Sequence, residues 1–436
     1  MRAKKLSIGL SAVFAISTVT PFILGTYATA QTEKVLHNFK LGAKPGGSGP
    51  EGNLIFDAAG NLYGTTFCGG THANDDCANE YQGYGIDGSG TVFELIPQSG
   101  GKWTEKVLHN FGSAEDGAGP DAAMIFDAAG NLYGTTLQGG TNGDGTVYEL
   151  MPKADGSWTE KVLYSFCSQS NCADGSQPFA PLVFDHAGNL YGTTYLGGRA
   201  YEGLGTVFEL SPEADGKWTE KVLHIFAGAP GDGANPQAGL VLDASGNLYG
   251  TTPIGGSNNC DYKAGCGTVF ELSLNASVGW TEALLYVFEG SEDSFGAEPN
   301  STLIFDSAGN LYGTTSGGPA FELLPQAGGG WAFAGLPICC GSNGVTVDAA
   351  GNLYGTIWAD DGGRCCGRAW KLSPETGGSW ATTVYTFPYD GEDGAFPLSG
   401  FIRDAAGNLY GATADGGSFW GQNYGEPAGT VFEITF

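Results

Sequence analysis

The chain has 436 residues, of which 75 are glycine, and its formal net charge is -28 at pH 7. Hydrophobic residues make up 41% of it, which is too much apolar material for a disordered glycine-rich chain. Because an acidic surface repels phosphates and anionic lipids, we expect neither nucleic acid nor a membrane surface as a partner.

Residues 1–30 have the pattern of a signal peptide. Basic residues from Arg2 to Lys5 precede an apolar stretch, and Ala28-Thr29-Ala30 is a small-residue cleavage site. Pro21 and that cleavage site argue against the alternative, a retained anchor helix. We therefore expect export to the periplasm or the medium, with no membrane span after signal cleavage.

One phrase then recurs seven times, which predicts a repeat architecture. The copies are FDAAGNLYGTT from Phe56, FDAAGNLYGTT from Phe126, FDHAGNLYGTT from Phe184, LDASGNLYGTT from Leu242, FDSAGNLYGTT from Phe305, VDAAGNLYGTI from Val347 and RDAAGNLYGAT from Arg403.

Each unit predicts four antiparallel strands, A to D. A D-x-x-G-N turn separates strand A (LIFD) from strand B (NLYGTT), because Asp bonds the turn backbone and Gly supplies a positive φ. Strand C is GTVFEL, and a Pro-x-x-x-Gly-x-Trp connection leads to strand D, TEKVLHNF.

The two ends of the expected mature chain predict how the repeats close. Thr32–Phe39 is a strand D with no unit before it, and Gly429–Phe436 is a strand C with no strand D after it. Paired, they complete the seventh sheet and remove the edges of an open array. The sequence thus predicts an all-β, seven-bladed β-propeller domain over 31–436, in which residues 31–39 form the outer strand of blade 7.

The phrase D-x-x-G-N-L-Y-G-T-T, with its following Gly-Gly and G-T-V-F-E-L, resembles the bacterial GloVer (Gloeobacter/Verrucomicrobia) tandem repeat of choice-of-anchor exported proteins. It is more distantly similar to the repeats of NHL-type propellers. The resemblance implies export and a repeated β-fold, and it implies no established reaction. Members often carry a variable C-terminal anchor. This chain ends at Phe436 inside a strand, so we expect a soluble product. We also expect a monomer.

Comparison of the seven copies locates the expected site. The A–B turns and C–D connections are nearly constant, whereas the B–C and D–A connections vary. In an up-and-down blade the two variable connections emerge on the same face. Binding residues usually lie on loops held by a rigid scaffold, so the candidate site is this variable face with the mouth of the central channel.

The variable loops contain aromatic and acidic side chains, which together suit sugar rings; local packing is the alternative for each aromatic. The expected ligand-binding residues are Tyr84, Tyr195, Tyr201, Tyr262, Trp358, Trp420, Tyr424, Asp87, Asp144 and Asp261. A glycosidase or lyase would need two of the carboxylates at a defined separation, and the sequence does not select a pair, so the catalytic residues stay unknown.

Ten cysteines in an exported chain predict disulfides. Local pairing joins Cys68 to Cys77, Cys167 to Cys172 and Cys260 to Cys266. The doublets Cys339-Cys340 and Cys365-Cys366 would then pair with each other, and the alternative for them is a four-thiolate metal site.

No cofactor or resident metal is expected, with structural calcium as the one alternative. D-G-x-x-P recurs at Asp116, Asp174, Asp232 and Asp393, which indicates either a capped turn or a calcium-binding ring of Asp. His37, His109 and His224 share one position of strand D with Tyr164, Tyr286 and Tyr385, which indicates packing and hydrogen bonding.

The sequence favours an exported binding module that presents variable loops, with glycans or cell-surface polymers as its ligands. Two alternatives stay open. One is a secreted carboxylate-based glycoside hydrolase or polysaccharide lyase, and the other is an adhesion or assembly scaffold.

Overall fold

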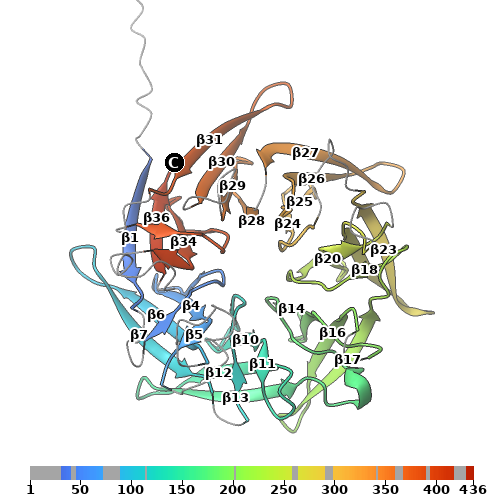
Figure 1. Cartoon of the computed structure of the whole chain (residues 1–436), viewed down its shortest axis with the longest axis horizontal. Coiled ribbons are helices and arrows are strands. Elements are labelled where there is room, and N and C mark those ends of the chain that lie inside the picture. Colours follow the sequence, from blue (N-terminus) through green and yellow to red (C-terminus); the bar gives the residue numbers. More distant parts are fainter. Residues whose placement is uncertain are drawn as a thin grey trace, which may run out of the picture. The chain divides into compact units, whose positions relative to one another are not determined.

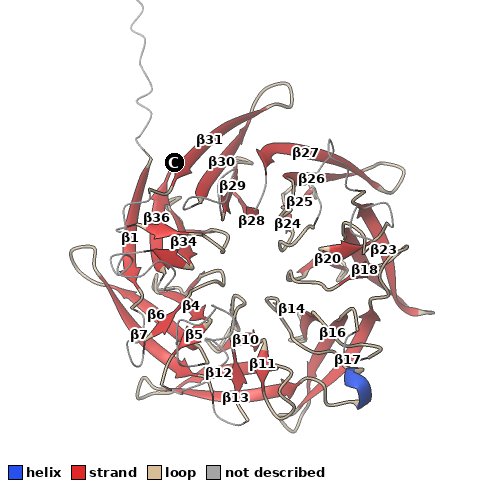
Figure 2. Cartoon of the chain, in the orientation of Figure 1, coloured by secondary structure: helices blue, strands red, loops and turns tan. Residues whose placement is uncertain are grey.

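The seven repeated units fold into seven four-stranded antiparallel sheets arranged in a ring, a seven-bladed β-propeller (Figure 1). The structure is a computed structural model. It describes residues 31–40, 46–71, 89–112, 115–200, 203–257, 264–289, 298–339, 342–358, 367–388, 393–416 and 429–436. Nearly all regular structure in these ranges is strand, apart from the short 3-10 helix η1 (Ser170–Cys172) (Figure 2).

Each blade runs from a short strand beside the central channel to a long strand at the rim (Figure 1). Blade 1 consists of β3 (Ile55–Phe56), β4 (Leu62–Thr66), β6 (Thr91–Pro97) and β7 (Trp103–Asn110). Blade 2 consists of β9 (Ile125–Phe126), β10 (Leu132–Thr136), β12 (Thr146–Pro152) and β13 (Trp158–Ser165). Blade 3 consists of β14 (Val183–Phe184), β15 (Leu190–Thr194), β16 (Thr206–Pro212) and β17 (Trp218–Ile225). Blades 4 and 5 are β19 (Val241–Leu242), β20 (Leu248–Thr252), β22 (Thr268–Asn275), β23 (Gly279–Val287); and β24 (Ile304–Phe305), β25 (Leu311–Gly313), β26 (Pro319–Pro325), β27 (Trp331–Cys339). Blades 6 and 7 are β28 (Ser342–Val347), β29 (Leu353–Ile357), β30 (Arg368–Pro374), β31 (Trp380–Thr386); and β33 (Ile402–Arg403), β34 (Leu409–Thr413), β36 (Thr430–Thr435), β1 (Thr32–Asn38).

In every blade except blade 6, the innermost strand has only two residues and is shorter than the phrase LIFD predicts, because its Asp leaves the ladder to build the A–B turn. In blade 3, Asp185 Oδ1 accepts hydrogen bonds from the backbone N–H groups of Ala187 and Asn189, at 2.8 and 2.9 Å. Its Oδ2 accepts from Asn189 Nδ2 at 2.8 Å and from the Tyr191 hydroxyl at 3.2 Å. Burial would raise the pKa of Asp185, but these hydrogen bonds outweigh it and hold the pKa below the ordinary value.

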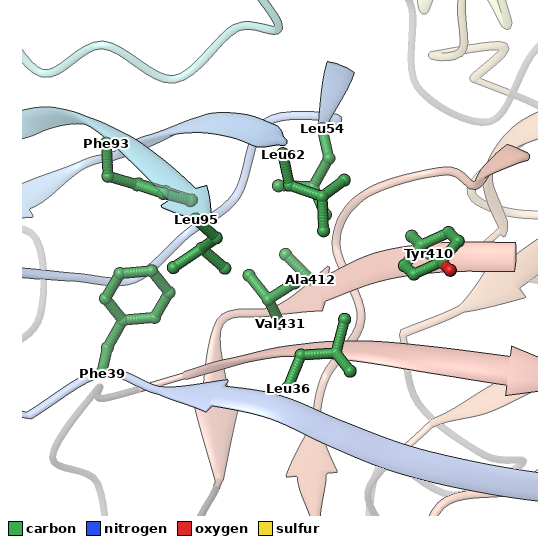
Figure 3. Close-up of a cluster of buried hydrophobic side chains, with 9 residues drawn as sticks. All are labelled: Leu36, Phe39, Leu54, Leu62, Phe93, Leu95, Tyr410, Ala412 and Val431. Atoms are coloured by element: carbon green, nitrogen blue, oxygen red, sulfur yellow. The ribbon is translucent and has the colours of Figure 1, made fainter. Parts of the chain in front are cut away.

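The ring closes as the ends of the sequence predict. Strand β1 pairs antiparallel with β36 from Thr32↔Thr435 to Asn38↔Thr430. Figure 3 shows the apolar cluster at this junction, where Leu36 and Phe39 lie with side chains of blades 1 and 7. Phe39 is 1% exposed, so the N-terminal strand contributes core as well as hydrogen bonds.

The B–C and D–A connections emerge on the same face, as predicted, because they pair with each other. Four two-stranded sheets join them: β2 (Gly47–Ser48) with β5 (Cys68–Gly69), β8 (Gly117–Ala118) with β11 (Gln138–Gly139), β18 (Gly233–Ala234) with β21 (Ile254–Gly255), and β32 (Gly394–Ala395) with β35 (Asp415–Gly416). Bridges Ser176↔Leu196 and Pro299↔Thr315 join the same two connections in blades 3 and 5. One face of the ring is therefore built from irregular, mutually supported loops.

The His and Tyr side chains of strand D link neighbouring blades at the rim, which confirms the packing and hydrogen-bonding interpretation. The Tyr385 hydroxyl of blade 6 donates to Glu33 Oε2 of blade 7 at 2.9 Å. His37 Nε2 of blade 7 lies 3.4 Å from Glu105 Oε2 of blade 1. Where blade 5 has Phe333 in place of the Glu, Tyr286 of blade 4 stacks on it with ring centroids 4.3 Å apart.

The Asp of D-G-x-x-P joins these rim contacts, as the capped-turn interpretation predicts. Asp116 Oδ2 lies 3.0 Å from His109 Nε2, and its Oδ1 accepts from the Gly117 N–H at 2.7 Å. Asp174 accepts from the Tyr164 hydroxyl and the Ser168 N–H, both at 2.8 Å. These Asp oxygens are engaged by their own loop and strand.

Two rim glutamates give the fold a pH dependence. Burial, followed by the Asp116 carboxylate, raises the pKa of Glu160 to about 7. Burial, followed by Asp174, raises the pKa of Glu220 to about 8. A pKa raised by folding means that the folded chain binds protons more tightly than the unfolded chain. Their stabilising contribution is therefore complete below the ordinary pKa of Glu and is lost as the pH rises through about 7 to 8.

We expect the melting temperature to rise when the pH falls from about 8.5 to about 6. Glu160→Gln and Glu220→Gln should each stabilise the protein at the higher pH by roughly 1 kcal/mol, because both groups keep part of their solvent. Thermal unfolding followed by circular dichroism at both pH values measures this. Glu213→Gln, at an exposed position of a C–D turn, is the control. A double variant that keeps the full wild-type pH dependence contradicts the assignment.

Candidate ligand site at the channel mouth

A cavity of about 490 Å³ lies at the mouth of the channel on the variable face. All seven blades contribute to it through the residues that immediately precede or begin strand A. Its volume falls within the range typical of small-ligand sites in proteins.

One position of the repeat gives the cavity its chemistry. It directly follows the proline of the D–A connection, and its side chain differs in each copy that lines the cavity: Glu51, Asp121, Phe179, Gln237, Asn300 and Leu398. The ring therefore presents two acids on blades 1 and 2, an aromatic on blade 3, two amides on blades 4 and 5, and an aliphatic side chain on blade 7. All six side chains are half-buried.

In the six copies that have it, the proline of the D–A connection packs against a glycine of the preceding blade and so fixes the cavity segment that follows it. In blade 2 the glycine that begins strand C, Gly145, has φ +92°, and a Cβ there would lie 2.6 Å from Pro178 Cδ of the next blade. The first Thr of the B strand adds a hydrogen bond: Thr135 Oγ1 donates to the Ala180 carbonyl at 3.2 Å. Phe179 lies between these two anchors, so its backbone is held on both sides.

Polar side chains two positions further along the repeat join successive blades around the cavity. Asn53 Oδ1 accepts from the Gly400 N–H at 2.5 Å, which links blades 1 and 7. Thr302 Oγ1 accepts from the Gly239 N–H at 3.0 Å, which links blades 5 and 4. Asn300 Oδ1, in contrast, is buried and makes no hydrogen bond with the residues that the structure describes. A ligand could reach this acceptor only after a rotation of the side chain, because the oxygen is covered in this structure.

Two of the sequence-predicted ligand residues lie in aromatic pairs on the variable face. Tyr195 lies beside the cavity residue Phe179, with ring centroids 6.4 Å apart. Trp358 is 43% exposed, and its centroid lies 6.4 Å from that of Phe396. The first pair belongs to blade 3 and the second to the junction of blades 6 and 7, so the two pairs lie on opposite sides of the ring.

The structure gives Asp144 a partner inside the protein. It is 8% exposed, and its Oδ1 accepts from the Ser176 hydroxyl at 2.8 Å. Its carboxylate therefore ties two loops together, which favours a structural role over ligand contact. The other predicted ligand residues lie outside the described residues: Tyr84, Asp87, Tyr201, Asp261, Tyr262, Trp420 and Tyr424.

Disulfides are present in the loops of the variable face. Cys167 and Cys172 are joined as predicted, within the D–A connection that leads to Phe179. Cys68 and Cys266 are also disulfide-bonded. Their predicted partners Cys77 and Cys260 lie outside the described residues, as do Cys340, Cys365, Cys366 and the side chain of Cys339. The doublet pairing and its thiolate alternative stay predictions.

A second cavity, of about 550 Å³, lies at the opposite end of strands A in blades 3 to 5. The A–B turns line it, and their Asp185 and Asp243 carboxylates are engaged in holding those turns. Because the turns repeat almost unchanged around the ring, the polar groups at this end serve to hold the fold together.

The cavity lies on the face that comparison of the copies predicts for the site, but its lining differs from the expected ligand-binding residues. The signal was present in the copies themselves. The residue after the repeated proline differs in each of the six copies that have this proline, although the flanking strands are nearly constant. None of the six side chains at this position was among the expected ligand-binding residues.

Comparison with known proteins supports the repeat reading. The profile of the Gloeobacter/Verrucomicrobia repeat family matches residues 78–323, more than half of the chain. No curated protein matches the sequence. Among solved structures, the chain is similar to a protein of unknown function from Dyadobacter fermentans DSM 18053, at 11% identity and a TM-score of 0.45. That match covers 92% of this chain and 99% of the other. Within the described ranges, no helix has the length and apolar character to span a bilayer.

Proposed function

Because the chain belongs to the Gloeobacter/Verrucomicrobia repeat family and folds as a seven-bladed propeller, we propose that it is a binding module for a neutral, polyhydroxylated polymer, such as a glycan. The ligand enters the channel mouth on the variable face. The observation that carries the proposal is the 490 Å³ cavity, which is lined by side chains that differ from blade to blade although the strands that hold them repeat.

The cavity chemistry supports a sugar. Glu51 and Asp121 supply carboxylate acceptors for hydroxyl groups, and Gln237 and Asn300 supply amides that both donate and accept. Phe179 with Tyr195 supplies an apolar face for C–H groups of a sugar ring. The net charge of -28 disfavours anionic polymers through repulsion.

The raised carboxyl pKa values lend no support to a glycosidase or lyase. A catalytic acid is expected in the ligand cavity with a raised pKa. The carboxyl groups with raised pKa values, those of Glu160, Glu220 and Glu282, belong to rim junctions, where Asp and His or Tyr side chains lie near them. Burial also raises the pKa of Asp415, which lies in β35 on the variable face but does not line the cavity. Recognition without bond cleavage is therefore the better account.

We also propose that the protein is exported. Disulfides persist in oxidising compartments, and the Cys167–Cys172 bond supports that location. N-terminal sequencing of the protein recovered from outside the cytoplasm of an expressing bacterium tests this, with a mature chain starting near residue 31 as the expected result.

An array of neutral oligosaccharides, followed by calorimetric titration of the best binder, tests the function. Phe179→Ala and Glu51→Gln should each weaken binding by roughly 10-fold or more, which corresponds to losing one good contact. Lys153→Ala, in a C–D turn on the opposite face, should bind like the wild type. An array without binders refutes the ligand class, and unchanged affinity in both cavity variants refutes the location. Release of sugar from mixed polysaccharides would favour the hydrolase or lyase instead.

A further inference from the structure

The rim junction between blades 3 and 4 brings three metal-ligating side chains together. His224 comes from β17, Asp232 from the following D–A loop and Glu282 from β23 of the next blade. Their ligand atoms all lie within 4.8 Å of one another. Three separate segments thus converge on one point at the outer edge of the variable face.

The spacing of the three groups fits a tetrahedral metal ion. His224 Nε2 lies 3.3 Å from Asp232 Oδ2 and 3.8 Å from Glu282 Oε1. An ion bound at the usual Zn–N and Zn–O distances separates its tetrahedral ligand atoms by about 3.3 to 3.5 Å. Small side-chain adjustments therefore bring all three atoms into the coordination sphere.

The surroundings hold the ligands in place. The Ala227 N–H donates to Asp232 Oδ2 at 2.7 Å, and the Gly233 N–H donates to its Oδ1 at 2.6 Å. The His224 ring packs edge-on against Phe226, with centroids 4.8 Å apart. Glu282 Oε1 is buried and makes no hydrogen bond with the described residues, and its contact there is the ion pair with His224. The site therefore contains an oriented acid, an oriented imidazole and a second, buried carboxylate.

The equivalent junctions do not bring such a set as close together. At blades 1 and 2, His109 and Asp116 pair at 3.0 Å and Glu160 lies near them, but the ligand atoms of these three residues are not all within 4.8 Å of one another. At blades 2 and 3, Tyr164 replaces the His. Asp144, Cys167 and Cys172 also lie close together, but their sulfur atoms are joined to each other. The blade 3–4 junction is thus the best candidate in the described chain.

We propose that His224, Asp232 and Glu282 bind a divalent transition-metal ion, for which Zn²⁺ is the best match. One imidazole nitrogen and two carboxylate oxygens are ligands that zinc accepts, and a water molecule would complete the tetrahedron. The ion would neutralise two adjacent carboxylates and join the rim strands of two blades. It would also fix the D–A loop that carries Gln237 into the ligand cavity.

Calorimetric titration of chelator-treated protein with ZnCl₂ tests the proposal. One Zn²⁺ per chain is expected, with a higher melting temperature in its presence. His224→Gln and Glu282→Gln should weaken Zn²⁺ binding by roughly 10-fold or more, because each removes a direct ligand. His109→Gln, the same strand D position two blades away, should bind Zn²⁺ like the wild type. Equal loss in all three variants, or no saturable binding by the wild type, overturns the site.

Co²⁺ provides a second measurement on the wild-type protein alone, in case a variant fails to fold. A four-coordinate site gives intense visible absorption bands, which Zn²⁺ should displace stoichiometrically. The weak spectrum of six-coordinate Co²⁺ contradicts the proposed geometry. Neither experiment depends on a glycan ligand, so each outcome is independent of the proposed function.

Discussion

Deletion of residues 31–40 is expected to abolish cooperative unfolding of the propeller at room temperature. The deletion exposes the edge of β36 along its whole ladder and removes Leu36 and Phe39 from the cluster in Figure 3. Loss of two buried large side chains costs about 2 to 5 kcal/mol each, and the sum approaches the total stability of a typical domain. Circular dichroism during heating, together with size-exclusion chromatography, measures the loss.

A permutant is the matched control for this deletion. In it, residues 31–40 follow Phe436 through a short glycine linker, so the same strand can pair with β36. It should regain a cooperative transition, because the contacts of blade 7 depend on position in space and not on chain order. If the deleted protein melts within a few degrees of the full chain, the closure carries far less stability than its burial indicates.

Two point variants compare the stability contributed at the junction that closes the ring with the stability contributed at an ordinary junction between blades. Phe39 and Phe111 occupy the same position of strand D and are 1% and 0% exposed. Phe39→Ala and Phe111→Ala should each destabilise the fold by about 3 to 5 kcal/mol. A much smaller loss for Phe39→Ala would show that the last junction is weaker than the others.

Gly192→Ala is expected to destabilise the protein by about 2 to 3 kcal/mol, which is the upper range for overpacking a tight core. A Cβ at Gly192 would lie 2.6 Å from Phe208 Cζ and 2.9 Å from Leu182 Cδ2. Phe208 and Leu182 are both buried, so neither ring nor methyl group has room to move. Gly192→Val should cause a larger loss.

Gly328→Ala is the control for this substitution. Gly328 lies in a C–D turn, has open space around its Cβ position and needs no positive φ. Its melting temperature should stay within the error of the wild type. Chemical denaturation of both variants compares the free energies of unfolding directly. If Gly192→Ala is as stable as Gly328→Ala, the aromatic ring of strand C does not limit the space over strand B.

The blade contents were predictable because their information is local. The Asp of the A–B turn bonds residues two and four positions away, and the strand C hairpin partner follows within one unit. The match between Thr32–Phe39 and the missing last strand also predicted the closure. The strand D pattern did not show the bulge between Val107 and His109, which interrupts the alternation of side chains.

The ligand site was only partly predictable. The face followed from comparing variable and constant connections, and the aromatic positions Tyr195 and Trp358 fell on it. The cavity side chains Glu51 and Asn300 precede a strand of only two residues, so a simple alternation rule gives no direction for them. Asp144 is an acidic residue of the kind that binds ligands. Its hydrogen-bond partner Ser176 is 32 residues away, so the sequence did not predict that the carboxylate is engaged within the protein.

The sequence by itself thus determined the number of blades, the strands in each blade, the closing pair and the variable face, because short-range patterns repeated seven times specify them. Only the tertiary structure decided which side chains meet. The cavity collects residues from all seven blades, and the His224, Asp232 and Glu282 cluster joins segments up to 58 residues apart. Such contacts depend on how neighbouring sheets pack around the ring, and no single repeat carries that information.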